Sequence, residues 1–327
     1  MKKDIKRVAV FTSGGDAPGM NAAVRAVVRT ASYYDLHVYG IYRGYEGMID
    51  GDIKRLETRD VGNIIHRGGT VLKTARSSRF LTPEGRKQAY ESLLAFDIDA
   101  CIAIGGNGTY TGAMVFNEEF DIPFVGIPGT IDNDIYGTDF TIGFDTAVNT
   151  AIEAIDRIRD TADSHNRLFF VEVMGRHSGY IALYSGIGSG AGSILLPETE
   201  NSVEELIRLL KMGARRNKLF SVIIVAEGNQ NGGASAIAEE VQKEFVDHET
   251  KVTIIGHLQR GGAPTCADRV LASRLGYGAV TGLLKGQRNV AIGVVNDHIH
   301  YTPFNEAIHK TKKLNEDLLS MAEILAL

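Results

Sequence analysis

The sequence of 327 residues has no tryptophan, only two cysteines and no excess of basic side chains. Cys101 and Cys266 do not make a disulfide framework, and Cys101 lies in an apolar run typical of a buried residue. The formal net charge of -5 excludes the basic surface of a nucleic-acid-binding protein. No apolar run approaches the roughly 20 residues of a membrane span. We therefore expect a soluble, cytoplasmic protein that binds neither nucleic acid nor membrane.

Glycine is abundant, with 37 residues, and many of these glycines join an apolar run to a helical pattern. The length favours two domains. Because strands alternate with helices throughout, we expect two doubly wound, Rossmann-like α/β domains with parallel sheets. The expected strands are 7–12, 38–42, 99–104, 122–127, 168–173, 193–196, 220–225, 252–255 and 290–295. The expected helices are 22–34, 85–96, 145–163, 202–216, 234–246, 268–284, one opened by residues 105–112, and one from 305.

Two glycine-rich turns, SGGDAPGMN at residues 13–21 and GGNGTYTG at 105–112, each follow a strand and lead into a helix. A helix N-terminus offers free N–H groups and a positive dipole end, which suits phosphate. The first turn is not a Walker A loop, because no Lys-Ser or Lys-Thr pair follows. The second has the spacing GxGxxxG, and no acid ends the next strand, which disfavours NAD binding.

Two carboxylates, Asp132 and Asp134, stand in IPGTIDND, residues 127–134, directly after an apolar strand. Open α/β sheets bind ligands at the carboxyl ends of their strands. Such a pair can hold hydrated Mg²⁺ and accept a proton. A surface turn is the alternative interpretation, because Asp, Asn, Gly and Pro are also common turn formers.

Charged residues recur at other strand ends and in the polar stretch 66–80. Each arginine is by default solvated, and each is also a candidate to contact phosphate. A lone histidine is more often structural, but beside several arginines it would complete an anion pocket. The arginines and the histidine meant here are Arg76, Arg79, Arg167, Arg176, His257 and Arg260. Together with the glycine turns and the Asp pair, they indicate phosphoryl transfer between two phosphate-bearing ligands.

Five blocks of sequence resemble bacterial ATP-dependent 6-phosphofructokinase of family A. They occur in that family's order and cover essentially the whole chain: TSGGDAPGMNAA (12–23), PGTIDNDI (128–135), EAIDRIRDTA (153–162), VEVMGR (171–176) and GHLQRGG (256–262). The resemblance implies ATP-dependent phosphorylation of fructose 6-phosphate to fructose 1,6-bisphosphate, the committed step of glycolysis, with Mg²⁺. It also implies a homotetramer in which residues 1–143 plus 257–305 bind ATP and residues 144–256 plus 306–327 bind the sugar phosphate.

The resemblance also implies roles for single residues. Asp132 would be the base, Thr130 and Arg176 would steady the transferring group, and Asp134 with Asn107 would serve Mg²⁺. The ATP site would comprise Gly15, Arg76, Asn107, Gly108, Thr109 and Gly112. The sugar site would comprise Thr130, Asp132, Met174, Gly175, Arg176, Glu227, His257 and Arg260, with Arg167 from a neighbouring subunit and Lys251 at the 6-phosphate. An allosteric site would keep Arg25, Arg29, Arg159 and Lys218.

Four positions depart from that family's pattern. Asn107 replaces an aspartate, and Lys251 replaces an arginine and loses its bidentate fork. In the allosteric site, Gly192 replaces a carboxylate and Thr58 an arginine. We therefore expect slower turnover and altered effector control.

Two alternatives stay open at this point. The first is a weakly active or non-catalytic paralogue that binds nucleotide or phosphosugar, which the departures favour and Asp132 disfavours. The second is a kinase that uses pyrophosphate or another sugar. Pyrophosphate-using relatives tend to carry Asp and Lys where this chain has Gly108 and Gly129, which favours ATP as donor.

Overall fold

The computed structural model describes residues 5–162, 167–199, 202–215, 222–246 and 248–326. The chain forms two compact units: unit 1 comprises Met1–Ile131, Ile135–Asp145 and Arg260–Lys312, and unit 2 comprises Asp132–Asp134, Thr146–Gln259 and Lys313–Leu327, with the gaps just given. The short segment Asp132–Asp134 therefore belongs to unit 2, although the chain on both sides of it belongs to unit 1. The expected assignment of ATP and sugar phosphate to two domains stays a prediction.

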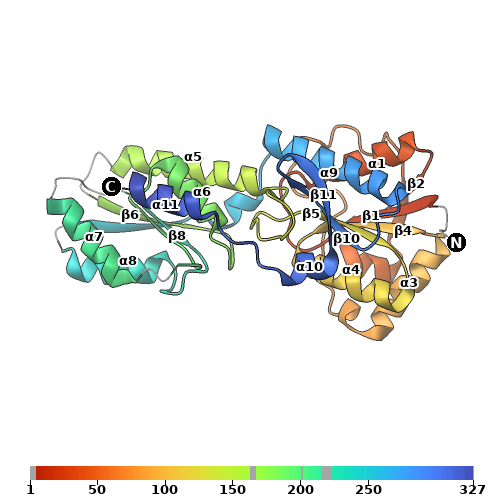
Figure 1. Ribbon diagram of the computed structural model, residues 1–327, viewed down its shortest axis with the longest axis horizontal. Helices are drawn as coiled ribbons and strands as arrows, with labels where there is room; N and C mark the ends of the chain where they lie inside the picture. The colour runs from red at the N-terminus through yellow and green to blue at the C-terminus, as the bar shows by residue number, and fades with distance from the viewer. Residues whose placement is uncertain (1–4, 163–166, 200–201, 216–221, 247, 327) are drawn as a thin grey trace. The chain divides into compact units, whose positions relative to one another are not determined.

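Within the described residues, unit 1 contains a seven-stranded sheet in the order β11-β10-β5-β4-β1-β2-β3 (Figure 1). The strands are β1 Arg7–Thr12, β2 His37–Ile41, β3 Ile53–Leu56, β4 Ala100–Gly105, β5 Phe124–Pro128, β10 Val290–Val295 and β11 His298–Pro303. The five inner strands are parallel, whereas β3 and β11 pair antiparallel with β2 and β10. The expectation of a purely parallel sheet was wrong at both edges. The connections from β10 to β11 (residues 296–297) and from β2 to β3 (residues 42–52) are both shorter than the dozen or so residues that a parallel crossover needs.

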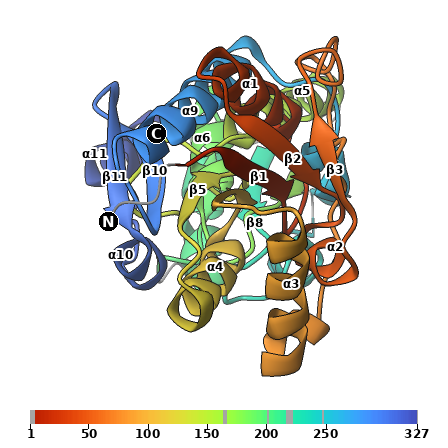
Figure 2. The same cartoon turned by 90° about the vertical axis from the view of Figure 1, so that its right-hand side faces the viewer.

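Helices cover both faces of this sheet (Figure 2). Helices α1 (Met20–Tyr33) and α9 (Cys266–Leu284) pack together on one face. The other face carries α2 (Gly44–Asp50), α3 (Pro83–Ala95), α4 (Asn107–Phe120) and α10 (Phe304–His309). A core rich in aromatic rings lies on this second side and includes Phe11, Tyr45, Phe80, Phe116 and Phe124. The sheet is thus doubly wound, as expected.

Unit 2 contains a four-stranded sheet in the order β7-β8-β6-β9, and all its described pairs are parallel. The strands are β6 Arg167–Val173, β7 Ser193–Leu195, β8 Val222–Ala226 and β9 Glu249–Ile254. Helices α7 (Val203–Arg215) and α8 (Ala234–Glu244) enclose an apolar core on one face. Helices α5 (Phe144–Ala162), α6 (Tyr180–Ser189) and α11 (Glu316–Leu325) lie across the other (Figure 1). The single helix expected from residue 305 is therefore two helices, α10 and α11.

Among the described helices, none combines the length and the apolar character that a membrane crossing requires.

The contact between α1 and α9 depends on Gly276. A β-carbon added there would lie 2.6 Å from the Ala26 β-carbon and 2.8 Å from the Ala23 carbonyl oxygen. Because the backbone of α1 cannot yield without moving the helix, we expect Gly276→Ala to destabilise the fold by about 1–3 kcal/mol despite alanine's better helix propensity. Urea unfolding followed by circular dichroism measures this loss.

Ser273→Ala is the matched control on the same helix. The Ser273 hydroxyl donates to the Arg269 carbonyl of its own helix at 2.7 Å, so its removal should change stability by less than about 0.5 kcal/mol. A Gly276→Ala variant as stable as this control would contradict the packing argument.

Candidate functional site

Three loops of unit 1 meet where the neighbouring strands β1, β4 and β5 end. The Ser13 N–H donates to the Ile104 carbonyl at 2.9 Å, and the Gly129 N–H donates to the Gly105 carbonyl at 3.0 Å. A β-carbon added at Gly105 would lie 2.6 Å from the Ser13 carbonyl oxygen, so this close approach requires glycine. The strand order reverses between β1 and β4, and such switch points are where open α/β sheets bind ligands.

Helix α4 opens inside the second glycine-rich stretch. It begins at Asn107, so Gly108, Thr109 and Gly112 lie in the first turns of the helix. The sequence had suggested that these residues form a turn that leads into the helix. A β-carbon added at Gly108 would meet no atom within 4 Å, which leaves open space beside the helix N-terminus. Gly112, in contrast, faces the Tyr45 ring, 3.0 Å from an added β-carbon. Gly108 is therefore free to admit a ligand, whereas Gly112 serves packing.

Asn21, at the start of α1, anchors the loop that leads to Arg76. Its buried side chain donates to the carbonyls of Arg67 and Gly68, at 3.0 and 3.2 Å, and accepts from the Val71 N–H at 2.7 Å. Sequence reasoning missed this role, because an asparagine beside a glycine turn also fits a helix cap or a solvated surface. The loop is thus held by the same helix start that follows the first glycine turn.

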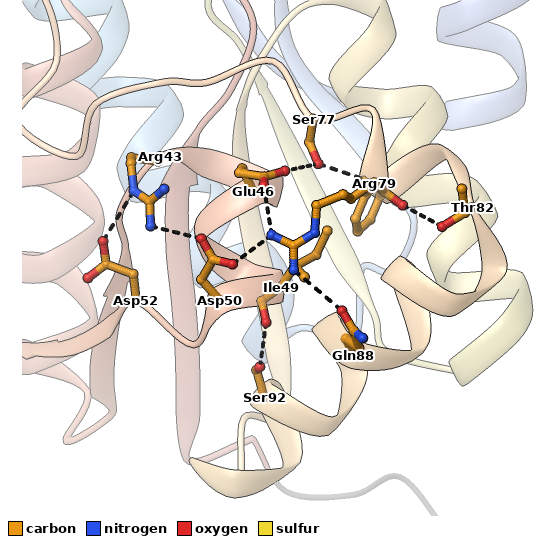
Figure 3. A network of polar contacts seen from close by, with 11 residues as sticks. Arg43, Glu46, Ile49, Asp50, Asp52, Ser77, Arg79, Thr82, Gln88 and Ser92 are labelled. Atoms are coloured by element: carbon orange, nitrogen blue, oxygen red, sulfur yellow. Dashed lines mark hydrogen bonds and ion pairs between the residues drawn. The ribbon is translucent and has the colours of Figure 1, made fainter.

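Arg79 is held by carboxylates of α2 (Figure 3). Its Nη1 donates to Glu46 Oε1 at 2.8 Å and to Asp50 Oδ1 at 2.7 Å, and the Ser77 hydroxyl also donates to Glu46. Hydrogen bonds from Ser77 and then Arg79 lower the pKa of Glu46, and Arg79 lowers the pKa of Asp50. Arg79 therefore fixes the segment that carries the exposed Arg76 and is not available as a phosphate ligand.

Two residues that the resemblance assigned to the sugar, Thr130 and Arg260, lie in unit 1. Arg260 Nη1 donates to the Asp16 carbonyl at 3.3 Å. A β-carbon added at Gly15 would lie 2.5 Å from the same Arg260 nitrogen. Gly15 therefore leaves room for an arginine beside the first glycine turn. The Thr130 carbonyl accepts from the Thr141 hydroxyl at 2.6 Å, which fixes the end of the β5 loop.

The carboxylate segment Asp132–Asp134 packs on unit 2. Its middle residue, Asn133, is buried and has a φ of 52°, a left-handed conformation that asparagine adopts more readily than most residues. The Ser178 hydroxyl donates to the Asp132 carbonyl at 2.8 Å. The segment is thus attached to the loop between β6 and α6, which contains Met174, Gly175 and Arg176.

Three side chains of unit 2 accept hydrogen bonds from the backbone N–H groups of this β6–α6 loop. The buried Gln259 accepts from the Met174 N–H at 2.8 Å. Glu227 Oε1 accepts from the N–H groups of Gly175 and Arg176, at 3.3 and 2.7 Å. Glu198 accepts from the Gly179 N–H at 2.8 Å. Glu227 therefore supports the loop backbone. Gln259 and Glu198 support it as well, and sequence reasoning missed both. The exposed His257 precedes Gln259 by two residues in a short 3-10 helix, Gly256–Arg260.

Arg167 and Lys251 are brought together by a carboxylate, Glu249. Arg167 opens β6 and is paired in register with Glu249 on β9. Its Nε donates to Glu249 Oε2 at 2.7 Å, and Lys251 forms an ion pair with Oε1 of the same carboxylate. Lys251 and then Arg167 lower the pKa of Glu249. This cluster lies near the amino end of β6, whereas Met174 and Arg176 follow its carboxyl end.

The expected allosteric residues are spread over both units. Arg25 and Arg29 are one turn apart on α1, and burial and then Arg29 lower the pKa of Arg25. Arg159 donates to the carbonyls of Ser189 and Gly190, where α6 ends, so it has a structural role there. Lys218 lies outside the described residues. In unit 1, Thr58 lines a hollow of about 260 Å³ with Ser32, His37, Arg55 and Glu57.

Among the described residues, no three His, Cys, Asp or Glu side chains are grouped to hold a metal ion by themselves.

The sequence profile of the family described as Phosphofructokinase matches residues 7–283. An ATP-dependent 6-phosphofructokinase of Cytophaga hutchinsonii is 56% identical over 321 residues, which cover 98% of each chain. ATP-dependent 6-phosphofructokinase 1 of Thermus thermophilus is 54% identical over 323 residues, covering 99% of this chain and 100% of the relative.

Solved structures agree in fold. Phosphofructokinase of Saccharomyces cerevisiae matches with a TM-score of 0.87 at 37% identity, covering 98% of this chain and 46% of the yeast chain. A pyrophosphate-dependent phosphofructokinase of Marinobacter aquaeolei matches with a TM-score of 0.84 at 24% identity, covering 98% of this chain and 92% of that one. The second likeness supports the fold alone.

The carboxylates around Arg79 give stability a defined pH dependence. Ser77 and Arg79 keep the pKa of Glu46 below its ordinary value of 4.5, and Arg79 and Arg43 keep that of Asp50 below 3.8. The part of this stabilisation that Arg79 contributes is complete above those values and is lost as pH falls through the lowered ones. We expect Arg79→Met to be less stable than wild type at pH 7 and equally stable in strong acid. Chemical denaturation at a series of pH values measures this difference.

Arg59→Met is the control, because Arg59 forms an exposed ion pair with Glu57 at 3.2 Å and should contribute little at any pH. A gap between Arg79→Met and wild type that stays constant from pH 7 into acid would contradict the assignment to these carboxylates.

Proposed function

The chain belongs to the phosphofructokinase family, and on that premise we propose that Asp132 is the base of its phosphoryl transfer. The reaction itself follows from near-full-length identity to ATP-dependent 6-phosphofructokinases: the chain phosphorylates fructose 6-phosphate with ATP as donor. The observation that carries the proposal is the hydrogen bond from Ser178 to the Asp132 carbonyl. It attaches the carboxylate segment to the loop that carries Arg176.

The nucleotide half of the proposal rests on unit 1. The glycine turns after β1 and β4 and the N-terminus of α4 offer backbone N–H groups and a positive dipole end to the ATP phosphates. Open space at Gly108 supports a nucleotide rather than a side chain at this position. Arg76, Asn107 and Thr109 stay the predicted side-chain contributors, whereas the packing of Gly112 against Tyr45 makes its role indirect.

The chemistry of the proposal rests on unit 2. Asp132 accepts the proton of the sugar's 1-hydroxyl as that oxygen bonds to the γ-phosphorus. The bond between the γ-phosphorus and the β,γ-bridging oxygen breaks, and ADP leaves with the electron pair. Arg176 offsets the negative charge on the transferring group, since such reactions depend mainly on alignment and charge neutralisation. Met174, Gly175, Glu227 and His257 would contact the sugar phosphate, and Thr130 and Arg260 stay predicted contacts.

Mg²⁺ fits the donor chemistry of two residues. Proteins commonly hold this ion through one or two carboxylates, while waters and substrate phosphates supply the remaining oxygen ligands. We propose the Asp134 carboxylate and the Asn107 amide oxygen as donors. When bound, the ion neutralises phosphate charge.

The positions of Arg167 and Lys251 support a site shared between two copies of the chain. Arg167 begins β6 and Met174 follows its end, and seven residues of strand span roughly 20 Å. That separation is too long for both ends of one β6 to contact the same sugar phosphate. We therefore propose that Arg167 and Lys251 bind the 6-phosphate of a neighbouring subunit's substrate, within a homotetramer. Exposed Val252 and Ile254 on the edge strand β9 support an interface at this part of unit 2.

A weakly active paralogue is the second candidate, favoured by Asn107 and Lys251. Effector control and a cytoplasmic location stay predictions.

The first test measures product formation from fructose 6-phosphate with Mg-ATP, and in parallel with Mg-pyrophosphate. We expect turnover with ATP alone and a loss of about 10²-fold or more in kcat for Asp132→Ala, because a positioned base contributes about that factor. Coupled detection of ADP and of fructose 1,6-bisphosphate measures both products. Asn107→Asp should raise kcat by restoring a charge beside the metal.

Asp139→Ala is the matched control, because Asp139 is an exposed carboxylate of unit 1 outside the proposed machinery, and it should retain wild-type turnover. Turnover that survives in Asp132→Ala would refute the base assignment. Turnover that appears only in Asn107→Asp would support the paralogue.

The shared site is tested by mixing two defective variants, Asp132→Ala and Arg167→Ala, and reassembling them from dissociated subunits. Each variant alone should be nearly inactive. In a mixed two-fold pair, one of the two sites combines intact Asp132 with intact Arg167, so an equal mixture should recover about a quarter of wild-type activity. Separately reassembled variants are the control, and a mixture no more active than their average would mean that each site is built from a single subunit.

A further inference from the structure

The Ser178 hydroxyl joins two segments of unit 2 that are far apart in the chain. The Ser178 side chain is buried, and its hydroxyl donates at 2.8 Å to the carbonyl of Asp132, 46 residues away in the chain. Two other buried serines of the same unit behave differently. Ser185 donates to Ile181 and Ser189 to Gly186, both within α6 itself. Ser178 therefore links two separate segments, whereas these serines satisfy their hydroxyls locally.

The loop that holds Ser178 is itself well fixed. The Ser178 N–H donates to the Gly175 carbonyl at 2.9 Å and closes a tight turn. A β-carbon added at Gly175, whose φ is 147°, would lie 2.2 Å from the Ser178 carbonyl oxygen, so the turn requires glycine. With Gln259, Glu227 and Glu198 bonded to its backbone, this loop is a rigid reference for whatever its side chains contact.

The segment that Ser178 contacts, Asp132–Asp134, depends on contacts with unit 2 for its position. Asp132–Asp134 packs on unit 2, but the residues before and after it belong to unit 1, and its middle residue has a left-handed backbone. A base must lie within hydrogen-bond reach of the proton that it accepts, and a displacement of about 1 Å lowers rates markedly. Holding the peptide carbonyl of Asp132 fixes the backbone from which the carboxylate extends.

We propose that Ser178 is a positioning residue for Asp132, aligning the base with the loop that carries Met174, Gly175 and Arg176. The inference rests on the proposed function and deepens it. The hydroxyl does not touch substrate. It fixes the position of the Asp132 backbone relative to the loop residues proposed to contact the sugar. The base would therefore lie at a constant distance from a sugar phosphate that is bound to the loop.

The test is steady-state kinetics of Ser178→Ala, with fructose 6-phosphate and Mg-ATP each varied. Loss of one hydrogen bond that acts on alignment should lower kcat by about five- to tenfold. Both KM values should stay within about twofold, because the loop keeps its bonds to Gln259, Glu227 and Glu198. Ser178→Cys, similar in shape with a weaker donor, should give an intermediate kcat. Thermal unfolding establishes that the variants are folded.

Ser185→Ala is the matched control: it removes a buried hydroxyl of the same unit whose partner lies in its own helix, and it should leave kcat unchanged. An unchanged kcat in Ser178→Ala, or a KM for fructose 6-phosphate that rises as much as kcat falls, would overturn the inference and leave the proposed function intact. A wild-type protein that forms no product would instead refute the proposed function, and this inference with it.

Discussion

The close approach of the loops after β1, β4 and β5 is the constraint on which the structure of unit 1 depends. Gly105 permits it, because any side chain there would collide with the Ser13 carbonyl. The approach aligns the first glycine turn with the start of α4, where the positive end of the helix dipole favours an anion. Two further contacts hold the segment 67–79 in unit 1. Asn21 attaches it to the start of α1, and Arg79 attaches it to α2.

Carboxylates hold the groups that this protein would use to bind phosphate. Glu249 lies between Arg167 and Lys251, Glu227 accepts from the N–H groups of Gly175 and Arg176, and Glu46 fixes Arg79 beside Arg76. Clustered cations repel one another, and buried N–H groups need partners, so an internal anion stabilises each arrangement before a ligand arrives. Under the proposed function, a phosphate would enter a region whose donors are already oriented, and it would compete with a resident carboxylate.

The sequence allowed the fold class, the inner strands and most helices to be predicted, because continuous apolar runs such as 7–12 and 290–295 leave little choice, and β1 and β10 have those bounds. The antiparallel edges were missed because β3 has only four residues and the polar residues of β11 resemble a loop. The resemblance supplied the candidate residues. It did not supply Asn21, Ser178 or Gln259, because their partners are distant in the chain and only the fold brings them together.

Donor preference illustrates why a residue type needs its surroundings. Glycine at 108 and at 129 had the same interpretation in the sequence, as residues that favour ATP over pyrophosphate as the donor. Around Gly108 an added β-carbon would meet nothing within 4 Å, so that glycine does leave room. At Gly129 the β-carbon would lie 2.9 Å from the end of the Met20 side chain and 3.0 Å from the Ile104 side chain, so a side chain there would first have to displace these two neighbours. Gly129 therefore has a packing role that is independent of the donor, and the argument for ATP from small residues rests on Gly108.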